Sequence, residues 1–247
     1  MSNLASVPAI PANCPQCNGT GWVTVSSDAN RAVACGCQGT LRRQQRMVAA
    51  HIPKRYEHCT LQSFRDKSEP ALRVAKQRVE AFIDLWPNTD DQRGLLLVGG
   101  CGTGKTHLAV ATLSEIIRCN KPGRLLFSNF QDLIQEIQAS FDPDSPVSKS
   151  DLLRPLLEAD LLVLDELGSQ KPTQFVQDIL YYIINTRYNE RLATIFTTNY
   201  FDTPADAKEE SLTLRIGTRL RSRLYEMTTM VEFTGARDHR LYRRNVL

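Results

Sequence analysis

A glycine-rich stretch near the middle of the chain, GGCGTGKT at positions 99–106, constrains the fold more than any other feature. It matches the pattern of a glycine, four residues and then Gly-Lys-Ser/Thr that is typical of phosphate-binding loops. The apolar run 95–98 precedes it, and residues 107–118 carry apolar side chains at helical spacing. The stretch therefore lies where a buried strand turns into a helix, which is the setting that such a loop requires.

This loop is predicted to hold a nucleoside triphosphate. Glycines let backbone N–H groups surround the phosphates, and the start of the following helix adds a partial positive charge. Lys105 is expected to reach the β- and γ-phosphates, and Thr106 to bind Mg²⁺. A chance glycine-rich turn is the alternative, and the strand–loop–helix setting argues against it. The predicted nucleotide-binding residues are Gly99, Gly100, Cys101, Gly102, Thr103, Gly104, Lys105, Thr106 and His107.

Two further strand ends carry residues suited to phosphate chemistry. The apolar stretch 161–164 runs into Asp165 and Glu166, and Asn199 follows the predicted strand 193–198. Asp165 is expected to hold Mg²⁺, and Glu166 to orient and deprotonate the attacking water. Asn199 is expected to hydrogen-bond the γ-phosphate or that water. The plainer interpretations are an exposed acidic strand end for Asp165 and Glu166, and a simple turn asparagine for Asn199. Because ligands of open α/β sheets bind beyond the carboxyl ends of the strands, these ends are predicted to converge on one crevice.

Strands and helices alternate from residue 71 onward, which predicts a parallel sheet with helices on both faces, an α/β fold. Helices are predicted at 71–86, 107–118, 130–141, 152–157, 173–190 and 211–226. Strands are predicted at 95–98, 125–128, 160–166, 193–198 and 230–233. This core domain is expected to occupy residues 51–247.

The region before the core, residues 14–50, contains two cysteine pairs. A β-prone segment, 22–25, and an expected polar turn, 26–31, separate the pairs, and the first pair has the C-x-x-C spacing typical of zinc sites. Few apolar residues lie here, so bound metal would supply the folding energy. A redox site is the alternative, but the surroundings lack a βαβ pattern. The predicted zinc ligands are Cys14, Cys17, Cys35 and Cys37.

The composition indicates a packed soluble protein, with 42% hydrophobic and 23% charged residues. The net charge of +3 is too small to indicate nucleic-acid binding by itself. Residues 1–13 resemble no secretory signal and are expected to be a disordered leader. No apolar stretch approaches the roughly 20 residues of a membrane helix, so a cytoplasmic location without membrane contact is expected. In that reducing compartment, the cysteines are expected to be thiols or metal ligands.

Arginines concentrate in two predicted helices. Residues 41–50 form a basic stretch that is expected to be a linker helix or a nucleic-acid contact. In the predicted helix 211–226, Arg215, Arg219 and Arg223 are four residues apart and are expected to share a face. Like charges on one face oppose folding unless an anion is near, so nucleic acid or the ATP of an adjacent subunit is the expected partner.

Taken together, these motifs resemble the AAA+ ATPases, and within them the branch of the DnaC and DnaI helicase loaders and the IstB transposition ATPases. The segments 52–56 and 61–64 resemble that branch's approach to the ATPase core, and residues 219–227 resemble its arginine helix. The resemblance covers roughly residues 50–244. It implies the sheet order 5-1-4-3-2, self-association through the ATPase domain, a DnaB-like replicative helicase as partner, and single-stranded DNA binding.

The resemblance also assigns roles to single residues. Asn199 matches sensor 1, and Arg240 matches the sensor 2 arginine that contacts the nucleotide in cis. Arg223 matches the arginine finger that acts on a neighbour's ATP, with Arg219 as the rival for that role. The expected function is therefore an ATP-dependent helicase loader in DNA replication, with catalytic residues Lys105, Asp165, Glu166, Asn199 and Arg223 and with ATP, Mg²⁺ and Zn²⁺ bound. One alternative is an IstB-like transposition helper. Another is a nucleotide-binding adaptor with little hydrolysis, and the presence of Glu166 and Arg223 argues against this adaptor.

Overall fold

The computed structural model divides the chain into two compact units, Met1–His51 and Ile52–Leu247. It describes residues 14–25, 28–66, 69–89, 92–203 and 209–242. The expected disordered leader, residues 1–13, lies outside this described part. None of the described helices is both long and apolar enough to span a bilayer.

The first unit contains a β-hairpin and a helix. Strand β1 (Trp22–Val25) pairs antiparallel with β2 (Asp28–Ala34), and α1 (Gly36–Ala49) follows. The predicted polar turn 26–31 is wrong in extent, because residues 28–31 belong to β2. Pairing with β1 overrides the weak strand preference of the Asp and Asn residues in this segment. The helix also begins five residues earlier than the predicted basic stretch and includes Cys37.

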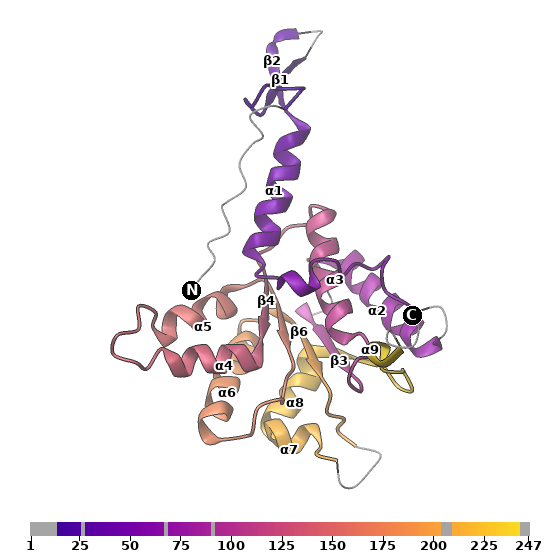
Figure 1. The fold of residues 1–247 in the computed structure, drawn as a ribbon, viewed down its shortest axis with the longest axis vertical. Coiled ribbons are helices and arrows are strands. Elements are labelled where there is room, and N and C mark those ends of the chain that lie inside the picture. Colours follow the sequence, from indigo (N-terminus) through magenta and orange to yellow (C-terminus); the bar gives the residue numbers. More distant parts are fainter. Residues whose placement is uncertain (1–13, 26–27, 67–68, 90–91, 204–208, 243–247) are drawn as a thin grey trace. The chain divides into compact units, whose positions relative to one another are not determined.

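The second unit is built on a five-stranded parallel sheet (Figure 1). Its strands are β3 (Gly94–Val98), β4 (Leu125–Asn129), β5 (Leu161–Asp165), β6 (Ala193–Thr198) and β7 (Thr228–Glu232). They lie in the order β4-β5-β6-β3-β7. If the strands of this sheet are numbered 1 to 5 along the chain, from β3 to β7, this is the implied order 5-1-4-3-2 read from the other edge. The predicted fold class is therefore confirmed. All five carboxyl ends meet at one edge, because the strands are parallel.

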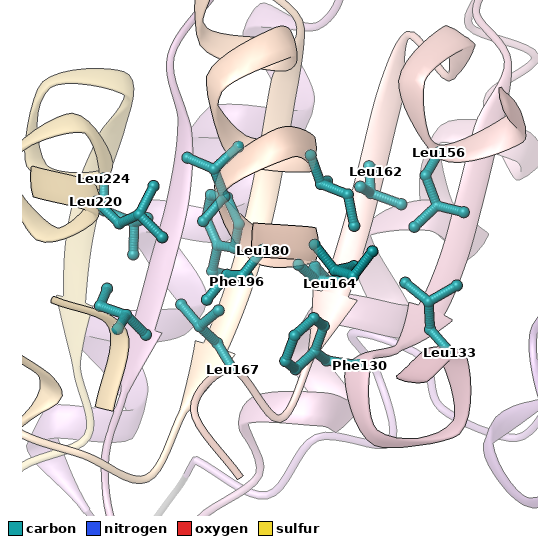
Figure 2. Packing of buried hydrophobic residues seen from close by; sticks show 14 of the residues in the cluster. Phe130, Leu133, Leu156, Leu162, Leu164, Leu167, Leu180, Phe196, Leu220 and Leu224 are labelled. Atoms are coloured by element: carbon teal, nitrogen blue, oxygen red, sulfur yellow. The ribbon is translucent and has the colours of Figure 1, made fainter. Parts of the chain in front are cut away.

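One face of the sheet is covered by five helices, α4 (Phe130–Ala139), α5 (Lys149–Glu158), α6 (Gln174–Asn189), α7 (Leu212–Ile216) and α8 (Thr218–Met227). Alternate strand residues such as Leu162, Leu164 and Phe196 point into this layer and pack against Phe130 and Leu180 (Figure 2). All five side chains are at most 2% exposed. Each such burial stabilises the fold by about 1.5–3 kcal/mol, so this layer anchors the strand ends that carry the site.

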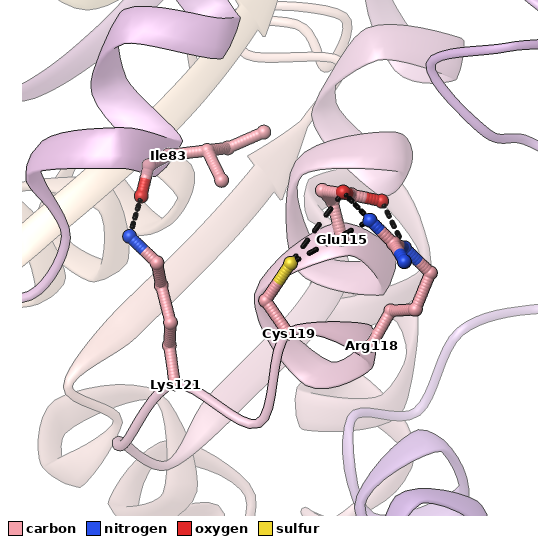
Figure 3. A network of polar contacts seen from close by, with 5 residues as sticks. All are labelled: Ile83, Glu115, Arg118, Cys119 and Lys121. Carbon is pink, nitrogen blue, oxygen red and sulfur yellow. Dashed lines mark hydrogen bonds and ion pairs between the residues drawn. The ribbon is translucent and has the colours of Figure 1, made fainter.

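The opposite face is covered by α3 (Lys105–Arg118), with α2 (Pro70–Leu85) beside it. Lys121, just after α3, donates from Nζ to the carbonyl oxygen of Ile83 at the end of α2 (Figure 3) and to that of Asp84. A cation there satisfies carbonyl groups that a helix end leaves unpaired. Arg118 and Glu115 form an ion pair one turn earlier on α3. The contacts of Lys121 fix α2 against the helix that starts at the phosphate-binding loop.

The single helix predicted over 211–226 is wrong, because the chain breaks at Gly217 into α7 and α8. Gly217 has φ 83° and ψ 152°, a conformation that favours glycine. Arg215 therefore does not share a face with Arg219 and Arg223. Its guanidinium pairs with Glu210 at 3.1 Å instead, so part of the expected charge repulsion is relieved within the chain.

Candidate functional site

The carboxyl end of β5 places Asp165 at the centre of a hydrogen-bonded cluster. Thr106 Oγ1, in the first turn of α3, donates to Asp165 Oδ1 at 2.9 Å, and Thr197 Oγ1 on β6 donates to the same atom at 2.6 Å. Asp165 is 1% exposed, and burial raises the pKa of its carboxyl while the two hydroxyl contacts oppose that rise. The two predicted Mg²⁺ ligands, Thr106 and Asp165, are thus in direct contact.

Glu166 lies one residue beyond the strand and is held by its neighbours. Its backbone has φ 60°, and its N–H donates to Thr197 Oγ1 at 2.9 Å. Its Oε2 accepts from Asn129 Nδ2 at 3.1 Å. Asn129 ends β4 directly beside Asp165 in the register of the sheet. Asn129 and Thr197 therefore orient the acidic pair.

These two positioning residues carry a weak sequence signal that the sequence prediction did not use. Asn129 ends β4 and Thr197 is the last residue but one of β6, and these strands flank β5, so the sheet order brings both residues to Asp165 and Glu166. Asn129 also stands directly before a helix, where its Oδ1 accepts from the N–H groups of Gln131 and Asp132. An asparagine at a strand–helix junction is typical of a helix cap. The sequence pattern therefore indicates the cap and gives no sign of the hydrogen bond to Glu166.

Lys105 is buried at the base of the loop, with 6% of its surface exposed. Its Nζ donates to the carbonyl oxygens of Gly99 at 2.8 Å and Gly100 at 2.7 Å. Burial lowers the pKa of this ammonium to about 8. A phosphate at the loop would compete with the carbonyls for Lys105 and raise its pKa again, because an adjacent negative charge favours the charged form.

The loop is held from both sides by other parts of the second unit. Gly104 has φ 101°, and a Cβ there would lie 2.7 Å from the ring of Phe64 in the lead-in segment, residues 52–64. The lead-in segment contains the short helix η1 (Lys54–Tyr56) and is anchored by His107, whose Nε2 lies 2.9 Å from Thr60 O. A Cβ on Gly102 would lie 1.8 Å from the Asp238 carboxylate. Both glycines are therefore required where the chain approaches the loop.

A cavity of about 510 Å³ opens above these groups. Glu166 and the exposed residues Asn199 and Arg240 line it together with the loop. Arg240 lies in α9 (His239–Tyr242), and its backbone N–H donates to Asp238 at 2.8 Å. The predicted loop residues that line the cavity are Cys101, Gly102, Gly104, Lys105, Thr106 and His107. The structure therefore gathers the predicted nucleotide and acidic residues around one crevice.

Arg223 does not line this cavity. Its guanidinium carbon lies 5.1 Å from the centre of the Tyr181 ring and 5.7 Å from that of Tyr188, both on α6. Its Nη1 is buried without a hydrogen-bond partner among the described residues. Arg219, one turn earlier on α8, is exposed. The predicted finger thus rests against its own chain rather than against its own nucleotide site.

The four cysteines of the first unit form one cluster, with sulfur atoms within 4.8 Å of one another. Cys14 and Cys35 sulfurs are 3.8 Å apart, and those of Cys17 and Cys37 are 3.6 Å apart. A tetrahedral zinc with Zn–S bonds of about 2.3 Å separates its sulfur ligands by roughly 3.8 Å. The Gly21 N–H also donates to Cys17 Sγ at 3.2 Å, which favours the thiolate form. The donor set fits a zinc ion.

Comparison with known proteins decides the family. The sequence model of the "IstB-like ATP binding protein" family matches residues 37–216. The chain belongs to this IstB-like family. The replicative helicase loader DnaC of Escherichia coli is 27% identical over 187 residues, which cover 74% of this chain and 70% of that protein. An insertion-sequence ATP-binding protein of Sinorhizobium fredii is 30% identical over 161 residues, 64% of this chain and 49% of that protein.

Solved structures agree with the IstB-like assignment. A crystal structure of the DnaC helicase loader has a TM-score of 0.61 and 32% identity, and the match covers 73% of this chain and 99% of that one. A crystal structure of DnaI has a TM-score of 0.59 at 22% identity, which shows a shared fold. The chain spans 63% of the length of the DnaC of Buchnera aphidicola, at 25% identity. The predicted resemblance is confirmed, and with it an ATP-binding AAA+ fold.

Proposed function

We propose that this protein is an ATP-hydrolysing switch that loads a replicative helicase onto DNA. The observation that carries the proposal is the Thr106–Asp165–Thr197 cluster beside Glu166, since it joins a Mg²⁺ ligand pair to a positioned carboxylate below the phosphate-binding loop. The names of the relatives, replicative helicase loader DnaC above all, support the choice of a helicase as partner. We place this activity in the cytoplasm.

In the proposed reaction, the chain's own groups position ATP and water. Lys105 exchanges its loop carbonyls for the β- and γ-phosphate oxygens. Thr106 and Asp165 would hold Mg²⁺, which neutralises charge on the phosphates when it is bound. Glu166, oriented by Asn129, accepts a proton from the attacking water. Asn199 and Arg240 reach the nucleotide from the mouth of the cavity.

The proposed finger, Arg223, acts on the ATP of a neighbouring copy. Its distance from its own cavity supports a role in trans, and self-association through the ATPase unit supplies the neighbour. Tyr181 and Tyr188 stack on the guanidinium, a contact worth about 0.5–2 kcal/mol that the arginine gives up when it reaches across. Arg219, which is exposed, is the alternative finger.

We further propose that the first unit binds one zinc ion through Cys14, Cys17, Cys35 and Cys37, and that it engages the helicase. Metal binding would supply folding energy that a hairpin and one helix lack, because α1 buries no residue of its own. Single-stranded DNA is the proposed substrate of the loading step, in keeping with the basic stretch of α1 and the arginines of α8.

A transposition helper is the second proposed function, because the insertion-sequence ATP-binding protein shares 30% identity with the chain. Co-purification separates the two. Tagged protein in the presence of ATP is expected to retain a DnaB-like hexameric helicase from its own host. Retention of a transposase without the helicase would replace the first proposal by the second.

A further inference from the structure

A second cavity, of about 400 Å³, lies at the amino ends of β3 and β6. Arg93 precedes β3, and Arg191 lies two residues before β6. Because the sheet is parallel, this cavity lies at the edge opposite the phosphate-binding loop. Arg187, Tyr188 and Glu226 complete the polar part of its lining. It is therefore separate from the proposed ATP crevice.

The cavity has an excess of positive charge. Arg93 and Arg191 are exposed, and neither side chain forms a hydrogen bond or an ion pair with any described residue. The lining residues include three arginines and one carboxylate, that of Glu226, which accepts from the Tyr188 hydroxyl at 2.8 Å. The carboxyl end of α6 also lies here, but its partial negative charge is small beside the full charges of three arginines. The cavity is thus suited to an anion.

Arg187 contributes a buried charge that forms no ion pair with the described residues. It is 0% exposed and donates to four neutral oxygens, those of Thr194 Oγ1, Leu156, Ala159 and Ala193, at 2.6–2.8 Å. Burial lowers the pKa of its guanidinium to about 9, and the negative charge of Asp160 opposes that shift. A buried cation is costly unless an opposite charge lies near. Asp160 supplies part of that charge, and an anion in the cavity would supply more.

Arg191 occupies a position where a side chain is unfavourable. It follows the end of α6 with φ 52°, and the two N–H bonds of this turn, Arg191 to Tyr188 O and Leu192 to Arg187 O, are those of a Schellman motif. Glycine is the usual residue there, and asparagine the common substitute. The equivalent turn after α3 has Asn120 at φ 54°. An arginine kept in this strained conformation points to a use for its side chain.

We propose that this cavity binds a phosphate group, either of a small phosphate compound or of a nucleic-acid backbone. Guanidinium groups bind phosphate in a bidentate manner, and Arg93 and Arg191 flank the opening from neighbouring strands. The proposal goes beyond the proposed ATPase activity, because none of the cavity's residues lines the ATP crevice.

The test uses the full chain with Lys105→Ala, which removes the main phosphate contact of the loop. Two probes are titrated, inorganic pyrophosphate and a short single-stranded oligothymidylate, and binding is followed by thermal unfolding and calorimetry. Arg93→Ala and Arg191→Gly are added to that background. Asn120→Gly is the matched control, since it also places a glycine at the position of positive φ after a helix, but away from the cavity.

Arg191→Gly and Asn120→Gly are both expected to raise the melting temperature without a probe, because each relieves a strained turn. Only Arg191→Gly and Arg93→Ala are expected to weaken probe binding, by about tenfold or more each, as for the loss of a charged hydrogen bond. For the oligonucleotide, the salt dependence of binding should fall by about one unit for each arginine.

The two probes identify the source of the phosphate. Weaker binding of pyrophosphate assigns the cavity to a small phosphate compound, and weaker binding of the oligonucleotide alone assigns it to a nucleic-acid backbone. Unchanged affinity for both probes in the two arginine variants overturns the proposal. None of these outcomes depends on ATP hydrolysis, so the proposed function stands or fails separately.

Discussion

Asn129 offers the sharpest test of how the crevice is organised, because its two ends serve different purposes. Its Oδ1 caps α4 by accepting from Gln131 and Asp132 N–H, at 2.9 and 3.3 Å. Its Nδ2 donates to Glu166 Oε2 at 3.1 Å. Asn129→Ala removes both functions, whereas Asn129→Ser keeps an oxygen for the cap and loses the reach to Glu166.

The two losses have separate magnitudes. Loss of a helix cap costs about 1 kcal/mol, which lowers the melting temperature of a domain of this size by about 2–4 °C. A hydrogen bond to a charged group contributes about 1.5–3 kcal/mol, so turnover should fall by roughly 10–100-fold if that bond positions Glu166. Both variants are expected to lose turnover alike, and Asn129→Ala should lose more stability than Asn129→Ser, by the contribution of the cap.

The assays are steady-state phosphate release at saturating ATP and thermal unfolding without nucleotide. ATP affinity serves as the control, because Asn129 does not line the cavity and both variants should bind normally. Wild-type turnover in Asn129→Ser would refute the positioning of Glu166. Equal destabilisation by serine and alanine would refute the cap.

Three further predictions concern the lysine, the cysteines and the arginine finger. Lys105 has a lowered pKa of about 8, and bound phosphate should raise that pKa. ATP binding near pH 8.5 should therefore take up protons, and ATP affinity should fall as the pH rises from about 7 to 9. Calorimetry in buffers of different ionisation enthalpy measures both effects, and the absence of both would contradict this prediction. Elemental analysis should find about one zinc per chain, lost in Cys14→Ser while the ATPase unit still unfolds cooperatively, and a folded first unit without metal would contradict the zinc site. Arg223→Ala should bind ATP and lose about 10³-fold or more in DNA-stimulated hydrolysis. Mixing it with Lys105→Ala protein should restore some activity, and no gain on mixing would favour Arg219 as the finger.

Much of the ATPase fold follows from the sequence, because its signals are local. The apolar runs before Gly99 and Asp165 are short and uninterrupted, as expected of strands buried on both faces. The phosphate-binding pattern fixes the first strand and helix together. The sheet order came from the family resemblance, and the parallel pairing confirms it.

The parts that the sequence did not predict depend on contacts between distant segments. Asn129 on β4 reaches Glu166 at the end of the adjacent strand β5, and Arg223 packs against the tyrosines of α6. No spacing along the chain indicates either contact. The break at Gly217 was missed because the arginine spacing on its two sides continues as if the helix were unbroken. Strand β2 was missed because its polar residues are strand-forming only through pairing with β1.

Phosphate release by Glu166→Gln protein tests the central claim, an ATP-hydrolysing crevice, most directly. The amide keeps the size of the side chain but cannot accept the proton of the attacking water. Wild-type protein with single-stranded DNA is expected to release phosphate, and the variant to bind ATP with wild-type affinity and lose about 10²–10⁴-fold in turnover. Turnover at the wild-type rate would contradict the role of Glu166 and with it the proposed chemistry of the crevice.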